Sequence, residues 1–322
     1  MSQTKSILCT LPERFVSPLI SKEEALKFRF TFRDSLRESI AQEDPSLQCQ
    51  ILWVGLKEKL TTDFLESLPQ LETVITSTTG TTHIDVEGLN ARGIALLSLK
   101  DKTRELNEVT ATPELAWGLF IAAHRKIIVT DRRKHRTSSY RDLYFASQIS
   151  SQRVGIVGFG RIGQKISSYA TSFGATTYYY DSKVTVESTK ARMRPLEWLV
   201  ENCDALFICA SKENENNTPI LGRDLVFRLR KESVLINIAR GSLVDEKAIL
   251  ECLQLGRIRG YATDVLQLEE VVANSSITED DLEWAVSRGL NLIVTPHIGG
   301  ASDEALLAVN RLMLDQLSKR EL

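Results

Sequence analysis

The sequence has 322 residues, of which 43% are hydrophobic and 25% are charged, and its formal net charge at pH 7 is −2. The composition is ordinary for a soluble globular protein, and the length suits two domains better than one. The charge gives no reason to expect nucleic acid or an anionic membrane as a partner, and no apolar run approaches the roughly 20 residues of a membrane span. Without a signal-peptide pattern or a Cys-x-x-Cys pair among its five cysteines, the chain is expected to be cytoplasmic and free of metal.

Short apolar runs alternate with helical patterns in the first hundred residues, which predicts a parallel sheet. An amphipathic helix is expected over residues 24–40, because apolar residues such as Leu26 and Phe30 recur at helical spacing. The other elements predicted here are strands at residues 6–9, 50–54, 73–76 and 94–97 and helices at residues 61–68 and 84–92. This unit has no Gly-x-Gly-x-x-Gly pattern, so we expect a dinucleotide site elsewhere.

A long, mostly apolar helix is expected over residues 113–128, with Thr112 as its N-cap and Pro113 in its first turn. Its apolar face is wide, which indicates burial on more than one side. The helical pattern is lost in residues 130–151, where a basic run at residues 132–136 precedes a few aromatic residues. We interpret this segment as a solvated arm in preference to a nucleic-acid site.

Residues 153–163 predict a strand, a glycine turn and a helix in direct succession. The turn contains a Gly-x-Gly-x-x-Gly pattern formed by Gly158, Gly160 and Gly163. Such glycines permit a tight turn, close approach of a pyrophosphate and close packing of the helix on the strand. The N-terminus of the helix also attracts phosphate groups.

A second strand-like run, residues 176–180, ends next to Asp181, which lies 23 residues after Gly158. An acidic residue at this place accepts hydrogen bonds from the adenosine ribose and repels a 2′-phosphate. The alternative is that Asp181 only caps a turn. Because strand, glycines, helix and second strand occur in register, we predict that NAD is the cofactor.

The alternation of strands and helices continues to the C-terminus. Strands are predicted at residues 205–209, 233–238, 260–265 and 291–295, and helices at residues 196–202, 224–229, 245–255 and 302–317. Counted from residue 154, six strands result, which is the number in a full dinucleotide-binding fold.

Three residues of possible chemical importance follow the last three of these strands: Arg240, Glu269 and His297. Ligands of open parallel sheets bind at the carboxyl ends of the strands, so these side chains are expected to converge where a nicotinamide lies. Taken singly, they have simpler interpretations: a surface cation before a glycine turn, a solvated loop acid and a turn histidine. Together they form a set suited to hydride transfer.

Reduction of a 2-keto acid needs a cation for the substrate carboxylate and carbonyl oxygen, and an acid that protonates the developing alkoxide. Arg240 suits the first task because a guanidinium is always charged and fork-shaped. His297 suits the second because imidazole titrates near neutrality, and Glu269 beside it would favour the imidazolium and orient the ring. The other histidines are interpreted as structural: His83, His124 and His135.

Five stretches occur in an order and spacing typical of one family: residues 79–85, 154–163, 237–246, 262–265 and 295–301. In these stretches the chain resembles the D-isomer-specific 2-hydroxyacid dehydrogenases, and most of all their phosphoglycerate-dehydrogenase type. The catalytic arginine, glutamate and histidine of that family fall on Arg240, Glu269 and His297.

The resemblance implies an α/β protein with two doubly wound parallel-sheet domains. A Rossmann NAD domain, residues 105–298, would be inserted in a flavodoxin-like substrate-binding domain, residues 1–104 and 299–322. The helix from Pro113 and the arm after it would form a homodimer interface. The implied cofactor-binding residues are Gly158, Gly160, Arg161, Ile162, Gly163, Asp181, Ile238, Ala239, Asp264, Gly299 and Gly300.

Thr79, Gly80 and Thr81 would hold the substrate carboxylate through their backbone amides. Lys100 is a candidate for contact with a distal substrate anion, and a solvated lysine is the alternative reading. The chain departs from the family pattern in having Glu270 where proline is usual. It also has residues 209–211 in place of a His-x-Pro pattern, followed by a longer loop at residues 212–218, which leaves the adenine contacts open.

We therefore predict an NAD-dependent dehydrogenase that transfers a hydride between NAD(H) and the C2 atom of a D-2-hydroxy or 2-keto acid. One alternative is an NAD(H)-responsive, corepressor-like binding protein on the same scaffold. Another is a dehydrogenase of formate or phosphite. The identity of the 2-hydroxy acid does not follow from the sequence.

Overall fold

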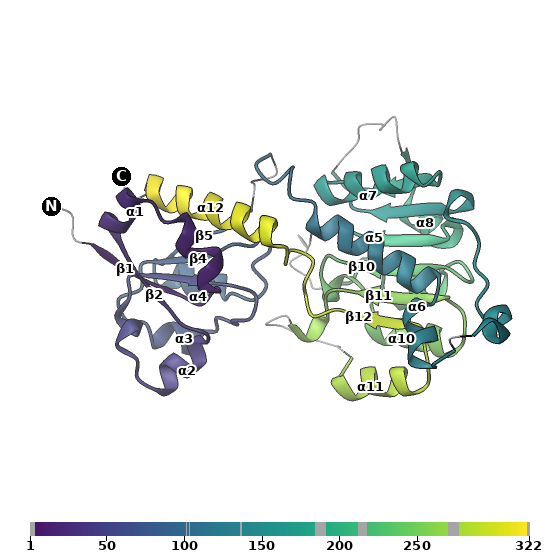
Figure 1. Cartoon of the computed structure of the whole chain (residues 1–322), viewed down its shortest axis with the longest axis horizontal. Coiled ribbons are helices and arrows are strands. Elements are labelled where there is room, and N and C mark those ends of the chain that lie inside the picture. The colour runs from purple at the N-terminus through teal and green to yellow at the C-terminus, as the bar shows by residue number, and fades with distance from the viewer. Residues whose placement is uncertain are drawn as a thin grey trace. The chain divides into compact units, whose positions relative to one another are not determined.

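The computed structural model describes residues 4–100, 102, 104–135, 137–183, 191–211, 218–269 and 277–320. The chain divides into two compact units, one formed by Met1–Val109 with Ala301–Leu322 and the other by Thr110–Gly300. Each unit contains a parallel β-sheet with helices around it (Figure 1). The prediction of two doubly wound α/β sheets is confirmed.

The sheet of the first unit has the strand order β2-β1-β3-β4-β5 among the described residues, and every pair is parallel. An order of 2-1-3-4-5 is that of flavodoxin-like sheets. The strands are β1 Lys5–Cys9, β2 Phe28–Phe32, β3 Ile51–Val54, β4 Thr73–Thr76 and β5 Ala95–Leu97. The α-helices are α1 Lys22–Lys27, α2 Leu36–Ala41, α3 Thr62–Glu66, α4 Val86–Ala91 and α12 Asp303–Arg320.

Helices cover both faces of this sheet. Leu8 and Leu52 belong to the buried cluster that includes residues of α2, α3 and α4, whereas their neighbours Ile7 and Trp53 belong to the cluster that includes residues of α12. Successive side chains of a strand point to opposite faces, so β1 and β3 are buried on both sides. The C-terminal helix α12 thus completes the core that the N-terminal segment begins (Figure 1).

The prediction of one helix over residues 24–40 is wrong. This segment contains α1, then strand β2, then α2, and Leu26 is 79% exposed. The run Phe28–Phe32 alternates aromatic and polar residues, which favours a strand, and it pairs along its length with β1. A strand repeat of two residues and a helical repeat of 3.6 residues are hard to distinguish over so few residues. The pairing of Phe28–Phe32 with β1 makes this segment a strand.

The sheet of the second unit has the order β12-β11-β10-β9-β6-β7-β8 among the described residues, and all its pairs are parallel. The strands are β6 Arg153–Val157, β7 Thr176–Tyr180, β8 Arg192–Met193, β9 Ala205–Ile208, β10 Val234–Asn237, β11 Gly260–Thr263 and β12 Leu292–Val294. The α-helices are α5 Ala111–His124, α6 Ile127–Arg132, α7 Arg161–Ser172, α8 Leu196–Asn202, α9 Arg223–Phe227, α10 Glu246–Gln254 and α11 Glu279–Ser287.

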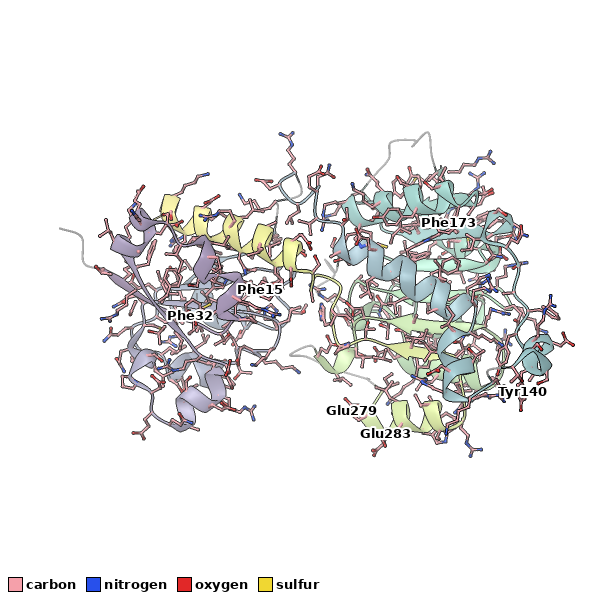
Figure 2. The ribbon with its side chains drawn as sticks, viewed as in Figure 1. Phe15, Phe32, Tyr140, Phe173, Glu279 and Glu283 are labelled. Atoms are coloured by element: carbon pink, nitrogen blue, oxygen red, sulfur yellow. The ribbon has the colours of Figure 1, made fainter. Side chains whose placement is uncertain are left out.

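Helices α5 and α7 cover one face of this sheet, and α8, α9 and α10 cover the other. Trp117 of α5 links the layers by stacking on Phe207 of β9 and by contacting Phe173, which follows α7. Phe173 lies at the end of that helix in Figure 2 and is 48% exposed. Since α5 contacts β10, β11 and α7, much of its wide apolar face is buried within its own unit.

The helix predicted over residues 113–128 is two helices. Helix α5 begins at Ala111 after Thr110, and Lys126 has a left-handed backbone with φ of +54° that separates α5 from α6. A lysine in this conformation is uncommon, and its sequence neighbours carry no glycine or proline signal for the break. The apolar pattern continues through the break, which is why the sequence predicted one helix.

Seven strands occur in the described part of the second unit, where six were predicted. The additional strand, β8, has two exposed residues at the sheet edge and no apolar run that would have signalled it. Numbered from β6, the strand order is 3-2-1-4-5-6-7, so β8 supplies the third strand of the dinucleotide-binding order 3-2-1-4-5-6 and β12 extends it by one. Helix α11 was also not predicted; its acidic first turn and capping box at Thr278 were the available signals.

Candidate active site

The glycine turn joins β6 to helix α7. Gly158 has φ of +93°, and a Cβ atom there would lie 2.5 Å from the Ala210 backbone. A Cβ atom at Gly163 would lie 2.2 Å from the Gly158 carbonyl oxygen, so α7 packs directly on the turn. At Gly160, by contrast, no atom of the described residues lies within 4 Å of a built Cβ. The first and third glycines thus permit the packing, and the second leaves the space that a pyrophosphate needs.

Asp181 follows β7 and lies against this turn. Its Oδ2 accepts a hydrogen bond from the Phe159 backbone N–H at 2.6 Å, and its Oδ1 accepts one from the Lys183 N–H at 2.8 Å. These bonds orient the Asp181 carboxylate beside the glycine turn, at the end of β7. The glycine turn and this oriented acid fit the NAD that the sequence predicts.

Arg240 lies in the turn after β10, and the buried Asn237 shapes that turn. The Asn237 Nδ2 donates to the Arg240 carbonyl oxygen at 2.9 Å, and its Oδ1 accepts from the Ala239 N–H at 3.1 Å. Sequence reasoning did not single out Asn237. The available signal was a polar residue at the end of an otherwise apolar buried strand.

Glu269 and His297 are in direct contact. The Glu269 Oε2 and the His297 Nδ1 are 2.7 Å apart, with side chains 31% and 25% exposed. A carboxylate only accepts, so Nδ1 carries the proton of this hydrogen bond. The Nε2 atom on the other side of the ring then remains for a second partner.

The buried Asp264 holds the loop that carries His297. Its Oδ1 accepts from the Thr295 hydroxyl at 2.6 Å and the Ile298 N–H at 2.8 Å, and its Oδ2 accepts from the Gly299 N–H at 2.7 Å. Burial raises the pKa of Asp264 above its ordinary value, and these three donors oppose the rise. Sequence reasoning placed Asp264 near the cofactor but did not predict its contacts with this loop.

The predicted substrate-carboxylate loop belongs to the first unit. A hydrogen-bond network lies beneath it, because the Thr76 hydroxyl lies 3.2 Å from the buried His83 Nε2 and 3.0 Å from the Thr78 hydroxyl. The Thr78 hydroxyl in turn donates to the Gly80 carbonyl oxygen at 2.7 Å. Thr79 is exposed at the top of the loop, and Lys100 is exposed beside β5.

Within the second unit, the structure brings the turn of Arg240 next to the turn of Glu269. A Cβ atom at Gly241 would lie 2.0 Å from the Gln267 backbone nitrogen. The predicted substrate residues lie in the other unit. Glu270 and residues 212–217, which carry two of the departures from the family pattern, are outside the described residues.

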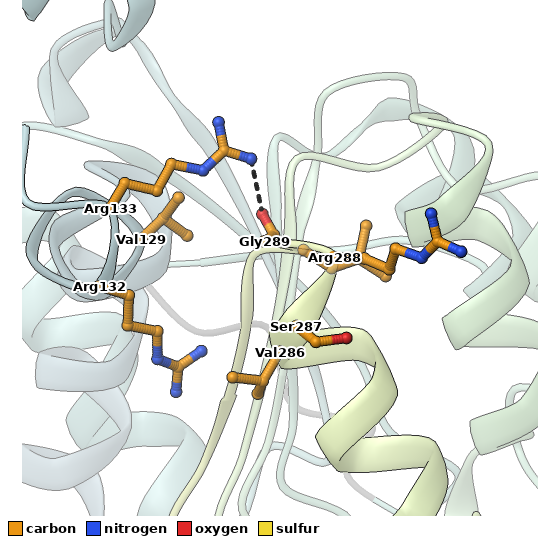
Figure 3. A pocket seen from close by; sticks show the side chains of 8 residues that line it. Val129, Arg132, Arg133, Val286, Ser287, Arg288 and Gly289 are labelled. Carbon is orange, nitrogen blue, oxygen red and sulfur yellow. Dashed lines mark hydrogen bonds between the residues drawn. The ribbon is translucent and has the colours of Figure 1, made fainter.

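Figure 3 shows a pocket elsewhere in the second unit. It has a volume of about 190 Å³ and lies between α6 and the segment from α11 to β12, before the amino end of that strand. Arg133 Nη2 donates there to the Gly289 carbonyl oxygen at 3.4 Å. The Arg288 side chain points away from that oxygen (Figure 3). No predicted site residue lines this pocket.

The described residues contain no group of three or more His, Cys, Asp or Glu side chains that could hold a metal ion. Their helices also include none with the length and apolar character that crossing a membrane requires.

Comparison with known proteins identifies the family. The family model for the NAD-binding domain of D-isomer specific 2-hydroxyacid dehydrogenases matches residues 117–299, more than half of the chain. A glyoxylate/hydroxypyruvate reductase from Arabidopsis thaliana is 30% identical over 80% of this chain and 76% of its own length. A D-3-phosphoglycerate dehydrogenase from Methanocaldococcus jannaschii is 29% identical over 89% of this chain.

The chain covers 51% of that M. jannaschii protein and 62% of a D-3-phosphoglycerate dehydrogenase from Haemophilus influenzae. Among solved structures, a D-isomer specific 2-hydroxyacid dehydrogenase from Polaromonas superposes with a TM-score of 0.78 at 24% identity, covering 99% of this chain and 96% of that one. An NAD-dependent formate dehydrogenase from Staphylococcus aureus in complex with NAD gives 0.79 at 21% identity, covering 98% and 95%. These two likenesses concern the fold.

The chain belongs to the D-isomer specific 2-hydroxyacid dehydrogenase family and carries its NAD-binding domain. The predicted family and the predicted cofactor are therefore confirmed.

Proposed function

We propose that the protein is an NAD-dependent D-2-hydroxyacid dehydrogenase, which transfers a hydride between NAD(H) and the C2 atom of a 2-hydroxy or 2-keto acid. One observation carries the proposal: the 2.7 Å contact between Glu269 and His297, beyond the carboxyl ends of strands in the NAD-binding sheet. Ligands of such sheets bind at that edge, and an imidazole held there by a carboxylate supports the proposed role of His297 as proton donor.

When bound, the nicotinamide ring would supply the hydride to the C2 atom of the substrate during reduction and accept it from that atom during oxidation. His297 Nε2 donates the proton that the carbonyl oxygen takes up during reduction, and it accepts that proton during oxidation. Glu269 fixes the ring and stabilises the imidazolium. Arg240 holds the substrate carboxylate and polarises the carbonyl group through its forked donors.

The glycine turn and Asp181 hold the cofactor in this proposal, together with Arg161, Ile162, Ile238, Ala239, Asp264, Gly299 and Gly300. The first unit serves as the substrate-binding domain, with the amides of residues 79–81 on the substrate carboxylate. The hydrogen-bonded Thr76, Thr78 and His83 support that assignment, because the Thr78 hydroxyl of this network binds the loop backbone at the Gly80 carbonyl oxygen. Lys100 is exposed and is assigned to a distal substrate anion.

The protein is further proposed to be cytoplasmic and homodimeric. The arm after α6 supports the dimer, because Leu143 is 61% exposed and Phe145 is 62% exposed. Tyr140, from the 3₁₀-helix Ser138–Leu143, is exposed on the same arm (Figure 2). Arg259 holds the arm in place by donating to the Phe145 carbonyl oxygen at 2.6 Å. An ordered arm with exposed large apolar side chains is typical of an interface between subunits.

A formate dehydrogenase is the second candidate function, since one superposing structure bears that name. The decisive experiment measures NADH oxidation with a panel of 2-keto acids that includes glyoxylate, hydroxypyruvate, phosphorylated acids and sugar-derived acids. Formate and phosphite are tested with NAD⁺ in parallel. Turnover of one keto acid well above the others supports the proposal. Turnover of formate or phosphite alone would replace it, and tight NADH binding without any turnover would indicate a binding protein.

The same panel tests nucleotide preference. We expect NADH to be used in preference to NADPH, because the Asp181 carboxylate repels a 2′-phosphate. The variant Asp181→Ser should raise kcat/KM for NADPH relative to NADH. Equal rates with both nucleotides in the unaltered protein would contradict the role of Asp181.

A further inference from the structure

Glu246 is a buried carboxylate whose contacts differ from what its position in the sequence suggests. It is the first residue of α10, where an acidic side chain usually interacts with the helix N-terminus. Capping of α10 is done by Asp245 instead, whose Oδ1 accepts from the Ala248 N–H at 2.9 Å. Glu246 is 1% exposed, and its Oε1 accepts a hydrogen bond from the Gln267 backbone N–H at 3.0 Å.

The turn after Arg240 packs closely against the Gln267 backbone, in addition to the hydrogen bond from Gln267 to Glu246. A Cβ atom at Gly241 would lie 2.0 Å from the Gln267 nitrogen and 2.2 Å from the Leu266 carbonyl carbon, so only glycine permits this approach. The backbone at Leu266 and Gln267 therefore lies between Gly241 and the Glu246 carboxylate.

The held backbone belongs to the 3₁₀-helix Gln267–Glu269, which carries Glu269. The Glu269 Oε1 accepts from the Leu266 N–H at 3.0 Å, and its Oε2 contacts His297 at 2.7 Å. One oxygen of Glu269 is thus bound to the held turn, and the other orients the imidazole. Without an acceptor, the buried Gln267 N–H would be unsatisfied, which favours movement of the turn towards water.

We propose that Glu246 is a positioning residue for catalysis, which sets the Glu269 carboxylate against His297 by fixing the backbone of residues 266–269. This role rests on the proposed dehydrogenase function. It also links the turn of Arg240 to the turn of Glu269, because both meet at the Gln267 backbone.

The test compares Glu246→Ala, Glu246→Gln and Glu246→Asp by steady-state kinetics with the best keto acid. Glu246→Ala should lower kcat by about 10- to 100-fold, as small displacements of catalytic groups do, while KM for NADH changes by less than about threefold. Glu246→Gln keeps an acceptor at the same reach and should restore most of the rate. Glu246→Asp shortens the reach and should give an intermediate loss in case the alanine variant does not fold.

Asp245→Ala is the matched control. It removes the cap of the same helix without touching Gln267, and kcat should remain within about threefold of the unaltered protein. The double variant Glu246→Ala/Glu269→Gln should be no slower than Glu269→Gln alone, because both changes disrupt one contact. Independent, multiplicative losses in the double variant, or equal losses in Asp245→Ala, would overturn the proposal.

Hydrogen exchange at residues 266–269 distinguishes failure of this proposal from failure of the proposed function. Exchange there should be at least about tenfold faster in Glu246→Ala than in Asp245→Ala, whether or not any keto acid is turned over. Absence of turnover with the whole panel would refute the dehydrogenase. Unchanged exchange at these amides would refute the role of Glu246.

Discussion

His297 has a backbone conformation that is uncommon for a residue other than glycine. Its φ is +54°, and its N–H donates to the Thr295 carbonyl oxygen at 2.9 Å. A non-glycine residue in this region costs about 1–3 kcal/mol and persists where the surroundings enforce it. Asp264 supplies that enforcement through its bonds to Thr295 and to the amides of Ile298 and Gly299. The strain is therefore located at the proposed proton donor.

His297→Ala should lower kcat for keto-acid reduction by about 10²-fold or more, because no other group replaces the proton donor. KM for NADH should change little, because the glycine turn and Asp181 are untouched. Steady-state kinetics at saturating NADH gives both constants. His124→Ala is a useful comparison, because that histidine is bonded to the Ser147 carbonyl oxygen and lies outside the proposed site. Near-normal turnover of His297→Ala would remove His297 from the mechanism.

Glu269→Gln should lower kcat for keto-acid reduction by about 10-fold or more, because the Glu269 Oε2 atom lies 2.7 Å from His297 Nδ1 and orients the imidazole. KM for NADH should change little, because the glycine turn and Asp181 are untouched. Steady-state kinetics with the best keto acid gives both constants. Unchanged turnover would exclude Glu269 from the mechanism.

At the scale of elements, the unit β6–glycine turn–α7 depends on one close approach. Gly163→Ala should destabilise the protein by about 1–3 kcal/mol, because the new Cβ would lie 2.2 Å from the Gly158 carbonyl oxygen and push α7 off the turn. NADH affinity should fall with it. Urea denaturation and NADH titration measure the two effects.

Gly118→Ala is the matched control within α5, where no atom of the described residues lies within 4 Å of the added Cβ. It should stabilise the helix by about 0.5–1 kcal/mol, since glycine is a poor residue for a helix interior. If both variants lost stability equally, the close packing of Gly163 would not be the cause.

Elements with strong local sequence patterns were predicted correctly, whereas elements that depend on pairing with residues distant in the sequence were not. Residues 153–163 and 176–180 form β6, α7 and β7 as expected, because their glycines and apolar periods act over a few residues. Strand β2 was mistaken for helix because its pairing with β1 joins residues more than 20 positions apart. Strand β8 was missed because two exposed residues at an edge carry almost no pattern.

For the whole molecule, the proposed homodimer makes the arm a testable surface. Phe145→Asp combined with Leu143→Asp should give a monomer, because two exposed apolar side chains would be replaced by charges at the subunit contact. Light scattering after size exclusion measures the mass. Leu255→Asp is the matched control, because Leu255 is 62% exposed at the end of α10 and outside the arm. A monomeric unaltered protein would contradict the proposed dimer.

The sequence by itself determined the fold class and the cofactor turn, and it predicted the proposed catalytic trio, because these depend on spacing along the chain. Glycines at fixed offsets and polar residues after buried strands act locally, and parallel strands bring their carboxyl ends to one edge. Only the tertiary structure shows which side chains hold the loops that carry the proposed catalytic residues. Asp264 meets Ile298 in the loop of His297 across 34 positions, and Glu246 meets Gln267 across 21. Such partners depend on how strands pack side by side, and a single buried carboxylate has no sequence pattern that reveals its partner.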